Sequence, residues 1–219
     1  MATQIKVSNE EPDSEQSLSV AEQRGARRVA LFIRTAKLIA DGREYLCVIR
    51  DVSASGVRVR TFHPIPQHQT LLLETDRGDR HLVELVWRTR DHAGFRFFEE
   101  VDVQRFVEDK HAAFPRRRIR MDLSLDAWLY ADCQLSKVVI RNISQQGAGI
   151  ECERWLTIGE LVRIETNVFS PIYAKVCWRR PPMYGLIFEQ TFQLDELAQL
   201  LAPLQPAEAP GRLSRKDAG

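Results

Sequence analysis

The chain has 219 residues, a hydrophobic content of 44% and a net charge of +1 at pH 7. This length predicts two domains of ordinary size, each able to bury a core. The near-neutral charge argues against a protein that binds nucleic acid through a strongly basic surface. No apolar run reaches the length of a membrane-spanning helix and the N-terminus lacks a signal-peptide pattern, so we expect a cytoplasmic protein without a membrane span.

The two ends of the chain differ in composition from the rest. Residues 1–20 are acidic and rich in serine, and residues 204–219 are rich in proline and then basic. Segments of such composition bury too little apolar surface to fold alone. We therefore predict a disordered N-terminal segment and a disordered C-terminal tail, with the folded part of the chain between them.

The folded part contains two copies of one sequence pattern. Sliding the sequence by 91 positions aligns eleven pairs of identical residues. Further upstream the offset becomes 92, and we expect the extra residue near Asp41-Gly42, because a hairpin turn tolerates changes of length. The repeat predicts a first domain over residues 21–110 and a second over residues 112–203.

Each copy reads as short strands followed by one helix. In the first copy, the strands are expected at 29–39, 44–50, 56–61, 70–75, 80–88 and 93–98, and the helix at 101–111. The second copy repeats this order and ends in an amphipathic helix at 194–201. Six closely spaced antiparallel strands favour a small barrel, because closure removes exposed strand edges.

Each copy opens with two arginines spaced four residues apart: Arg24 and Arg28 in the first, Arg116 and Arg120 in the second. Like charges at this spacing repel on a helix, and Pro115 stands directly before the second pair, so we expect extended arms. A solvated basic linker explains one such cluster, but two clusters at matching places are harder to explain in this way. The planar guanidinium fork suits phosphate and the O6/N7 edge of guanine.

A polar turn with the pattern Asp/Asn-x-Ser-x-x-Gly follows the second strand of each copy. Its residues are Asp51, Ser53 and Gly56 in the first copy, and Asn142, Ser144 and Gly147 in the second. The aspartate can accept hydrogen bonds from guanine N1–H and N2–H, whereas the asparagine offers only its carbonyl oxygen. The serine hydroxyls can meet a phosphate oxygen, and the glycines permit a positive φ or a close ligand approach. The alternative is an ordinary turn closed by Asx and serine side chains.

The arginine pair, the hairpin and this turn together resemble the PilZ domain, the bacterial receptor for cyclic di-GMP. The sequence Gly94-Phe95-Arg96-Phe97 ahead of the helix, with its counterpart from Gly185, also resembles that family. The resemblance implies a mainly β protein with two tandem six-stranded antiparallel β-barrels, each followed by a C-terminal helix. It also implies that cyclic di-GMP is held between the arginine arm and the barrel surface. Both copies keep both motifs, and the ligand-binding residues carried over are Arg24, Arg28, Asp51, Ser53, Gly56, Arg116, Arg120, Asn142, Ser144 and Gly147.

The function that the resemblance implies is a non-catalytic cyclic di-GMP receptor. Ligand would change the domain arrangement or a surface for a protein partner of unknown identity, in motility, attachment or polysaccharide-related processes. One alternative is a degenerate tandem that binds a protein partner without nucleotide, which the intact arginine and serine positions disfavour. Another is a small-barrel binder of single-stranded nucleic acid, which the near-neutral charge and the aromatic content of 8% disfavour, so no DNA or RNA is expected.

Other reactive residues in the sequence indicate no chemistry. The four cysteines lack metal-ligand spacing, and we expect buried free thiols. Trp87 and Trp178 occupy matching strand positions, where packing is expected rather than base stacking. The histidines show neither metal spacing nor a catalytic triad, and phosphate loops and nucleophile elbows are absent, so we expect no enzyme, no metal and no cofactor.

Overall fold

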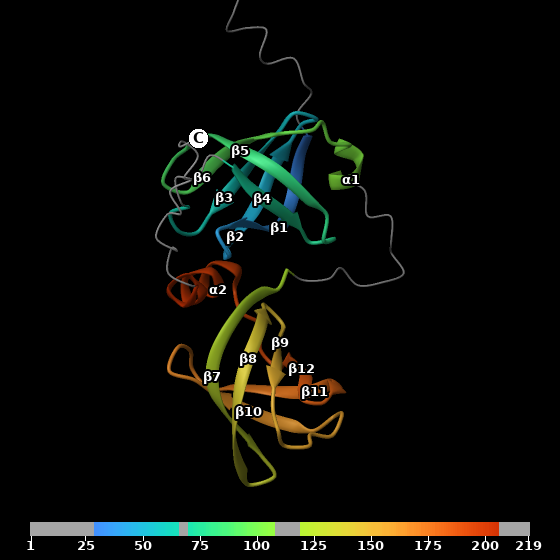
Figure 1. Ribbon diagram of the computed structural model, residues 1–219, viewed down its shortest axis with the longest axis vertical. Helices are drawn as coiled ribbons and strands as arrows, with labels where there is room; N and C mark the ends of the chain where they lie inside the picture. Colours follow the sequence, from blue (N-terminus) through green and yellow to red (C-terminus); the bar gives the residue numbers. More distant parts are fainter. Residues whose placement is uncertain (1–28, 66–69, 108–118, 206–219) are drawn as a thin grey trace, which may run out of the picture.

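The computed structural model describes residues 29–65, 70–107 and 119–205, which form two closed β-barrels (Figure 1). The first copy of the repeat forms one barrel, called barrel one, and the second copy forms barrel two. The barrels follow one another along the long axis of the molecule.

Both barrels consist of six antiparallel strands in the same order. The elements of barrel one are β1 (Val29–Ala40), β2 (Arg43–Val52), β3 (Gly56–Thr61), β4 (Thr70–Thr75), β5 (Arg80–Arg88), β6 (His92–Phe97) and α1 (Val103–Val107). Those of barrel two are β7 (Met121–Ala131), β8 (Gln134–Ser144), β9 (Gly147–Glu151), β10 (Leu161–Glu165), β11 (Ile172–Arg180), β12 (Met183–Phe188), α2 (Leu194–Leu201) and the 3₁₀ helix η2 (Ala202–Leu204). Neighbouring strands run β1-β2-β3-β6-β5-β4 in barrel one, and barrel two follows the same order from β7. The predicted fold class is confirmed.

The first hairpin of each barrel closes through a two-residue turn with left-handed backbone. Asp41 and Gly42 have φ values of 49° and 76°, as expected for an Asp-Gly hairpin turn. The matching turn of barrel two is Asp132-Cys133, with φ values of 46° and 59°. A cysteine therefore stands where glycine is usual, and only the repeat pointed to this turn.

The extra residue of the first copy does not lie at the Asp41-Gly42 turn, where the sequence placed it. Both hairpin turns have two residues, because Ala40 pairs with Arg43 and Ala131 pairs with Gln134. The copies differ instead at a bulge in their first strands. In β1, three residues lie between Ala30 and Arg34 opposite a single residue of β2, whereas β7 has two residues at the corresponding bulge. A bulge accommodates an added residue because that residue leaves the hydrogen-bonded ladder.

Alternating side chains from the strands fill the interior of each barrel. Leu38, Val59 and Leu73 are fully buried in barrel one, and Leu129 and Ile150 are fully buried in barrel two. Alternation of this kind follows from the period of two in a strand, and it places the polar members of each strand outside. Each barrel therefore has a hydrophobic core of its own.

Helices follow the last strand of each barrel. The predicted helix at 194–201 is confirmed as α2, which begins with a capping box between Gln193 and Glu196. The predicted helix at 101–111 is shorter within the described residues, where α1 covers Val103–Val107. Neither helix of the described part has the length and apolar character required to cross a membrane.

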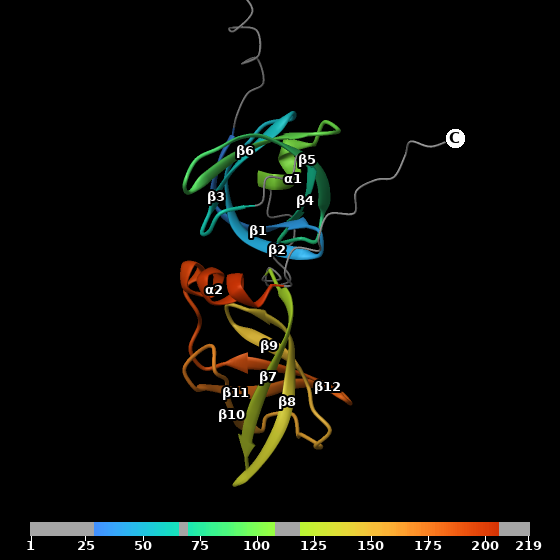
Figure 2. The ribbon, with the colours of Figure 1, turned by 60° about the vertical axis from the view of Figure 1, so that its left-hand side comes forward.

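The C-terminal helix of barrel two lies between the two barrels (Figure 2). Leu197 and Leu201 of α2 share a hydrophobic cluster with Leu46, which belongs to β2 of barrel one. The chain continues through η2, so that Gln205 lies buried against barrel one and accepts a hydrogen bond from the backbone N–H of Glu44. Leu204 and Gln205, which the sequence assigned to the tail, thus belong to the fold.

Candidate functional site

The two Asp/Asn-x-Ser-x-x-Gly motifs form tight turns between the second and third strands of each barrel. In barrel one, the Ser53 hydroxyl donates to the Gly56 carbonyl oxygen at 3.3 Å and accepts from the Gly56 N–H at 3.2 Å. In barrel two, the Ser144 hydroxyl donates to the Gly147 carbonyl oxygen at 3.2 Å. Both serines are buried, and their hydroxyls hydrogen-bond within the turn.

The motif glycines serve a close approach between strands. Neither Gly56 nor Gly147 has the positive φ that the sequence interpretation allowed for. A Cβ atom on Gly56 would lie 2.8 Å from the carbonyl oxygen of Phe95 in β6. A Cβ atom on Gly147 would overlap the carbonyl oxygen of Leu186 in β12. The neighbouring strand therefore leaves no room for a side chain at Gly147 and little room at Gly56.

The carboxylate of Asp51 in the first copy forms an ion pair with an arginine of its own barrel. Its Oδ2 atom accepts a hydrogen bond from Arg58 Nε at 2.5 Å, and the two residues are direct cross-strand partners on β2 and β3. Around this turn lies a hollow of about 180 Å³, which also has Trp87 and Arg96 in its wall. Arg96 is itself paired with Glu84. The cationic side chains of this hollow are thus already neutralised by carboxylates.

The structure brings together Arg120 and Asn142 of the second copy. Nη1 of Arg120 donates to Oδ1 of Asn142 at 2.7 Å, and the arginine is exposed. Within the described residues, the Arg120 guanidinium meets no carboxylate. An exposed arginine that only a neutral amide holds is available to an anion. The other three predicted arginines, Arg24, Arg28 and Arg116, lie outside the described residues.

Beside the copy-two turn lies a larger hollow of about 740 Å³ between the barrels, called the interdomain cavity. Barrel two contributes Arg120, Ser144, Gly147 and Cys177 to its wall. Barrel one contributes Lys37 and the turn between β4 and β5. The second motif therefore opens onto a space that both barrels enclose, whereas the first motif opens onto barrel one alone.

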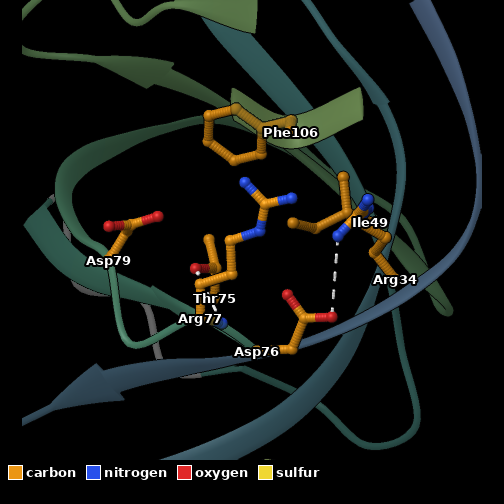
Figure 3. A pocket seen from close by; sticks show the side chains of 7 residues that line it. All are labelled: Arg34, Ile49, Thr75, Asp76, Arg77, Asp79 and Phe106. Atoms are coloured by element: carbon orange, nitrogen blue, oxygen red, sulfur yellow. Dashed lines mark hydrogen bonds and ion pairs between the residues drawn. The ribbon is translucent and has the colours of Figure 1, made fainter. Parts of the chain in front are cut away.

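The turn between β4 and β5 of barrel one lies between two hollows, and the sequence analysis did not identify its residues as part of a site. Thr75, Asp76 and Arg77 line the interdomain cavity, and they also line a small hollow at the end of barrel one. Figure 3 shows this second hollow, where Arg34 pairs with Asp76 at 3.7 Å and Arg77 extends toward Phe106. Arg34 points into the barrel at the position where the second copy has Leu125, since each pairs with the matching isoleucine of its neighbour strand. That departure from the repeat was the available signal.

The matching tryptophans pack on the barrel surface, as expected from the sequence. Trp87 and Trp178 are 43% and 39% exposed, and each indole lies against a glycine of the next strand. A Cβ atom on Gly94 or Gly185 would overlap the indole ring, which explains why both copies have glycine there. The Trp87 ring also forms one wall of the copy-one hollow.

The four cysteines are all free thiols, in two classes. Cys47 and Cys152 are buried, and burial raises the pKa of both thiols because it disfavours the thiolate. Cys133 and Cys177 are exposed, so the prediction of buried thiols is wrong for these two. No group of His, Cys, Asp and Glu side chains in the described part of the chain is arranged to hold a metal ion.

The sequence pattern of the PilZ domain family matches the chain over residues 22–109 and again over residues 114–203. The chain belongs to the PilZ family. The two PilZ segments coincide with the two barrels, so the protein is a tandem of PilZ domains. No curated protein matches the chain.

Several solved structures are similar to the tandem at low identity. The PlzA protein of Borreliella burgdorferi, crystallised with c-di-GMP, is 13% identical, with 82% of this chain and 93% of PlzA covered and a TM-score of 0.34. The motility inhibitor MotI/DgrA of Bacillus subtilis is 15% identical, with 77% and 92% covered and a TM-score of 0.31. YcgR of Escherichia coli, also in complex with c-di-GMP, is 11% identical, with 76% and 80% covered and a TM-score of 0.28.

Proposed function

We propose that this tandem PilZ protein is a non-catalytic receptor for cyclic di-GMP, and that its principal site is the copy-two turn together with the interdomain cavity. The observation that carries the proposal is Arg120, an arginine without a carboxylate partner in the described residues, at the wall of a cavity of about 740 Å³. Its guanidinium can donate two parallel hydrogen bonds to a phosphate or to guanine O6 and N7. Membership of the PilZ family supports the choice of ligand.

A ligand in the interdomain cavity would contact both barrels at once. Binding there would change the free-energy difference between arrangements of the barrels, since only a ligand with different affinities for two arrangements shifts their populations. The output would be an altered surface for a protein partner, in motility, attachment or polysaccharide-related processes. No step of this proposal requires catalysis.

The proposal is tested by calorimetric titration of the full chain with cyclic di-GMP, cyclic di-AMP and GTP. We expect saturable binding of cyclic di-GMP only, because the arginine and the turn match the guanine edge. Equal affinity for cyclic di-AMP would contradict the guanine-edge argument.

The location of the site is tested separately by alkylation of the exposed cysteines. Cys177 lines the interdomain cavity, whereas Cys133 lies in the β7–β8 turn. Saturating cyclic di-GMP should slow the alkylation of Cys177 and leave Cys133 as reactive as before. Protection of neither residue, in a protein that binds the ligand, would place the ligand elsewhere.

The alternative of a protein-binding adaptor without nucleotide has one observation in its favour. In the first copy, Arg58 forms an ion pair with Asp51. In both copies, the motif serine hydroxyl is hydrogen-bonded within its own turn. An absence of heat on titration with cyclic di-GMP would favour this adaptor over the receptor.

A further inference from the structure

Two charged residues on the outside of barrel one are buried by the junction with barrel two. Lys37 and Glu44 are 5% and 8% exposed, although Ala36 and Leu38 on either side of Lys37 are the residues that point into the barrel. Lys37 Nζ lies 2.6 Å from Glu44 Oε1 and 3.4 Å from Glu74 Oε1. Burying charges is unfavourable unless each is paired and hydrogen-bonded, so this arrangement needs a reason.

The remaining hydrogen bonds of this pair go to barrel two, at the segment that carries Arg120. Lys37 Nζ donates to the backbone carbonyl oxygen of Arg120 at 3.0 Å. Glu44 Oε2 accepts from the backbone N–H of Asp122 at 2.7 Å. The two charged side chains therefore bind the backbone on both sides of Met121, at the carbonyl of Arg120 and the N–H of Asp122, where β7 begins.

The repeat shows that a PilZ barrel folds without these charges. The strand registers match Lys37 with Trp128 and Glu44 with Leu135 in barrel two. Trp128 and Leu135 are 49% and 51% exposed, so barrel two presents this face to solvent within the described structure. The Lys37–Glu44 pair is thus a property of the junction and not of the barrel fold.

Arg120 is held from two sides as a result. Its backbone carbonyl is bound by barrel one, while its guanidinium is bound by Asn142 of barrel two at 2.7 Å. A side chain whose backbone is fixed loses less conformational entropy when it binds a ligand, which raises affinity without adding a contact to the ligand.

We propose that Lys37 and Glu44 are positioning residues for the ligand site of barrel two, acting through the backbone of Arg120. The inference rests on the proposed function, because it concerns the affinity for cyclic di-GMP. Barrel one therefore tunes the site of barrel two through the backbone of Arg120. The Lys37 ammonium lies in the wall of the interdomain cavity, but Glu44, Glu74 and the Arg120 carbonyl oxygen already bind it.

The test replaces both charges at once with Lys37→Met and Glu44→Leu. Removing Lys37 alone would leave the buried Glu44 carboxylate without its cationic partner and destabilise the fold, whereas replacing both by apolar residues avoids that. Trp128 and Leu135 show that apolar residues are compatible with these positions. We expect cyclic di-GMP to bind about tenfold more weakly by calorimetry, as the loss of about 1.4 kcal/mol of preorganisation implies. Thermal unfolding of the variant should show both barrels folded.

A matched control is Lys137→Met, which removes a lysine of the first hairpin of barrel two. Lys137 is 3.5 Å from Asp126, and both side chains are largely exposed. This variant should bind cyclic di-GMP as the unmodified protein does, because it does not touch the junction. Amide exchange at Asp122 should become faster in the double variant and stay unchanged in Lys137→Met.

A double-mutant cycle separates positioning from general damage. In an Arg120→Ala protein, the two junction substitutions should cause no further loss of affinity, since they act through that residue. An equal loss in both backgrounds would overturn the inference, and so would undiminished binding by the folded double variant. If the unmodified protein gives no binding at all, the receptor proposal itself fails and the inference falls with it.

Discussion

Gly147→Ala should destabilise barrel two because of the strand beside it. The new Cβ would overlap the carbonyl oxygen of Leu186 and lie 3.2 Å from its carbonyl carbon, so β9 and β12 would have to separate where Gly147 pairs with Ile187. Overpacking of this kind costs about 3 kcal/mol, and replacing a strand glycine by alanine returns about 0.5–1 kcal/mol. The net loss of about 2 kcal/mol lowers the Tm of a domain of this size by about 8–16 °C.

Gly56→Ala provides the matched comparison in barrel one. Its Cβ would lie 2.8 Å from the Phe95 carbonyl oxygen, a much smaller overlap. The cost of about 1 kcal/mol is largely offset by the gain from replacing glycine, so we expect little change in Tm. Gly185→Ala should fall between the two, because its Cβ meets the Trp178 indole, a 39% exposed side chain that can turn outward.

Thermal unfolding of the full-length variants, with amide exchange read separately in β3 and β9, assigns each loss to its barrel. The order of destabilisation should be Gly147→Ala, then Gly185→Ala, then Gly56→Ala. If Gly147→Ala unfolds at the same temperature as Gly56→Ala, the close approach of β12 does not explain the glycine of the second motif.

Three further outcomes are expected. Phe192→Ala should destabilise barrel two by about 3–5 kcal/mol in chemical denaturation, because this buried ring packs edge-on against Phe169 and Phe188. A loss below about 1 kcal/mol would mean that these two ring contacts contribute little. Burial lowers the pKa of His63 below its ordinary value of 6.5, so the unfolded chain binds a proton there at a higher pH than the folded chain does. The folded state is therefore not penalised by this histidine above pH 6.5 and loses stability as the pH falls below it, because protonation then favours the unfolded chain. The Tm difference between pH 7.5 and pH 5.5 should be smaller in His63→Gln than in the unmodified protein. Finally, Arg28→Ala keeps the copy-two site intact, and Arg120→Ala keeps the copy-one site intact. Titrations with cyclic di-GMP at low and high salt should show the steeper loss of affinity in Arg28→Ala. The reason is that the denser arginine cluster at 116–120 attracts phosphate through charges that salt screens. A steeper loss in Arg120→Ala would reverse this assignment.

Local chemistry made the strands and the turns of this protein predictable. The alternation of apolar residues and the Asp41-Gly42 dipeptide determine the hairpin whatever the rest of the chain does. The predicted position of the extra residue was wrong because no local sequence pattern marks the bulge in β1. Residues 29–33 form a continuous apolar run, and such a run looks the same with or without a residue that leaves the ladder.

The motif positions were predictable, but their roles in this state were less so. Asp51 has its partner Arg58 directly across the β2–β3 pairing, and a sequence-based register would have suggested that ion pair. The purpose of Gly56 and Gly147 depends on β6 and β12, which are distant in sequence. A pattern along one strand cannot report the distance to another strand.

The junction between the barrels could not be read from either copy alone. Its signals are departures from the repeat, such as Lys37 where the other copy has Trp128, and Leu46 where it has Lys137. Comparing the copies position by position shows which face differs, although not what covers it. Burial of a lysine and a glutamate on the outside of a barrel becomes understandable only once the second barrel is in place.

The two ends of barrel two both bind Glu44 of barrel one. Glu44 accepts from the N–H of Asp122 through its side chain, and its own N–H donates to the Gln205 side chain. A force that pulls Gln205 away from barrel one would therefore act first on the junction, where the contacts of Glu44, of Lys37 with Arg120 and of Leu46 with α2 connect the two ends of barrel two directly to barrel one. These contacts would have to break before barrel two is stretched between its ends.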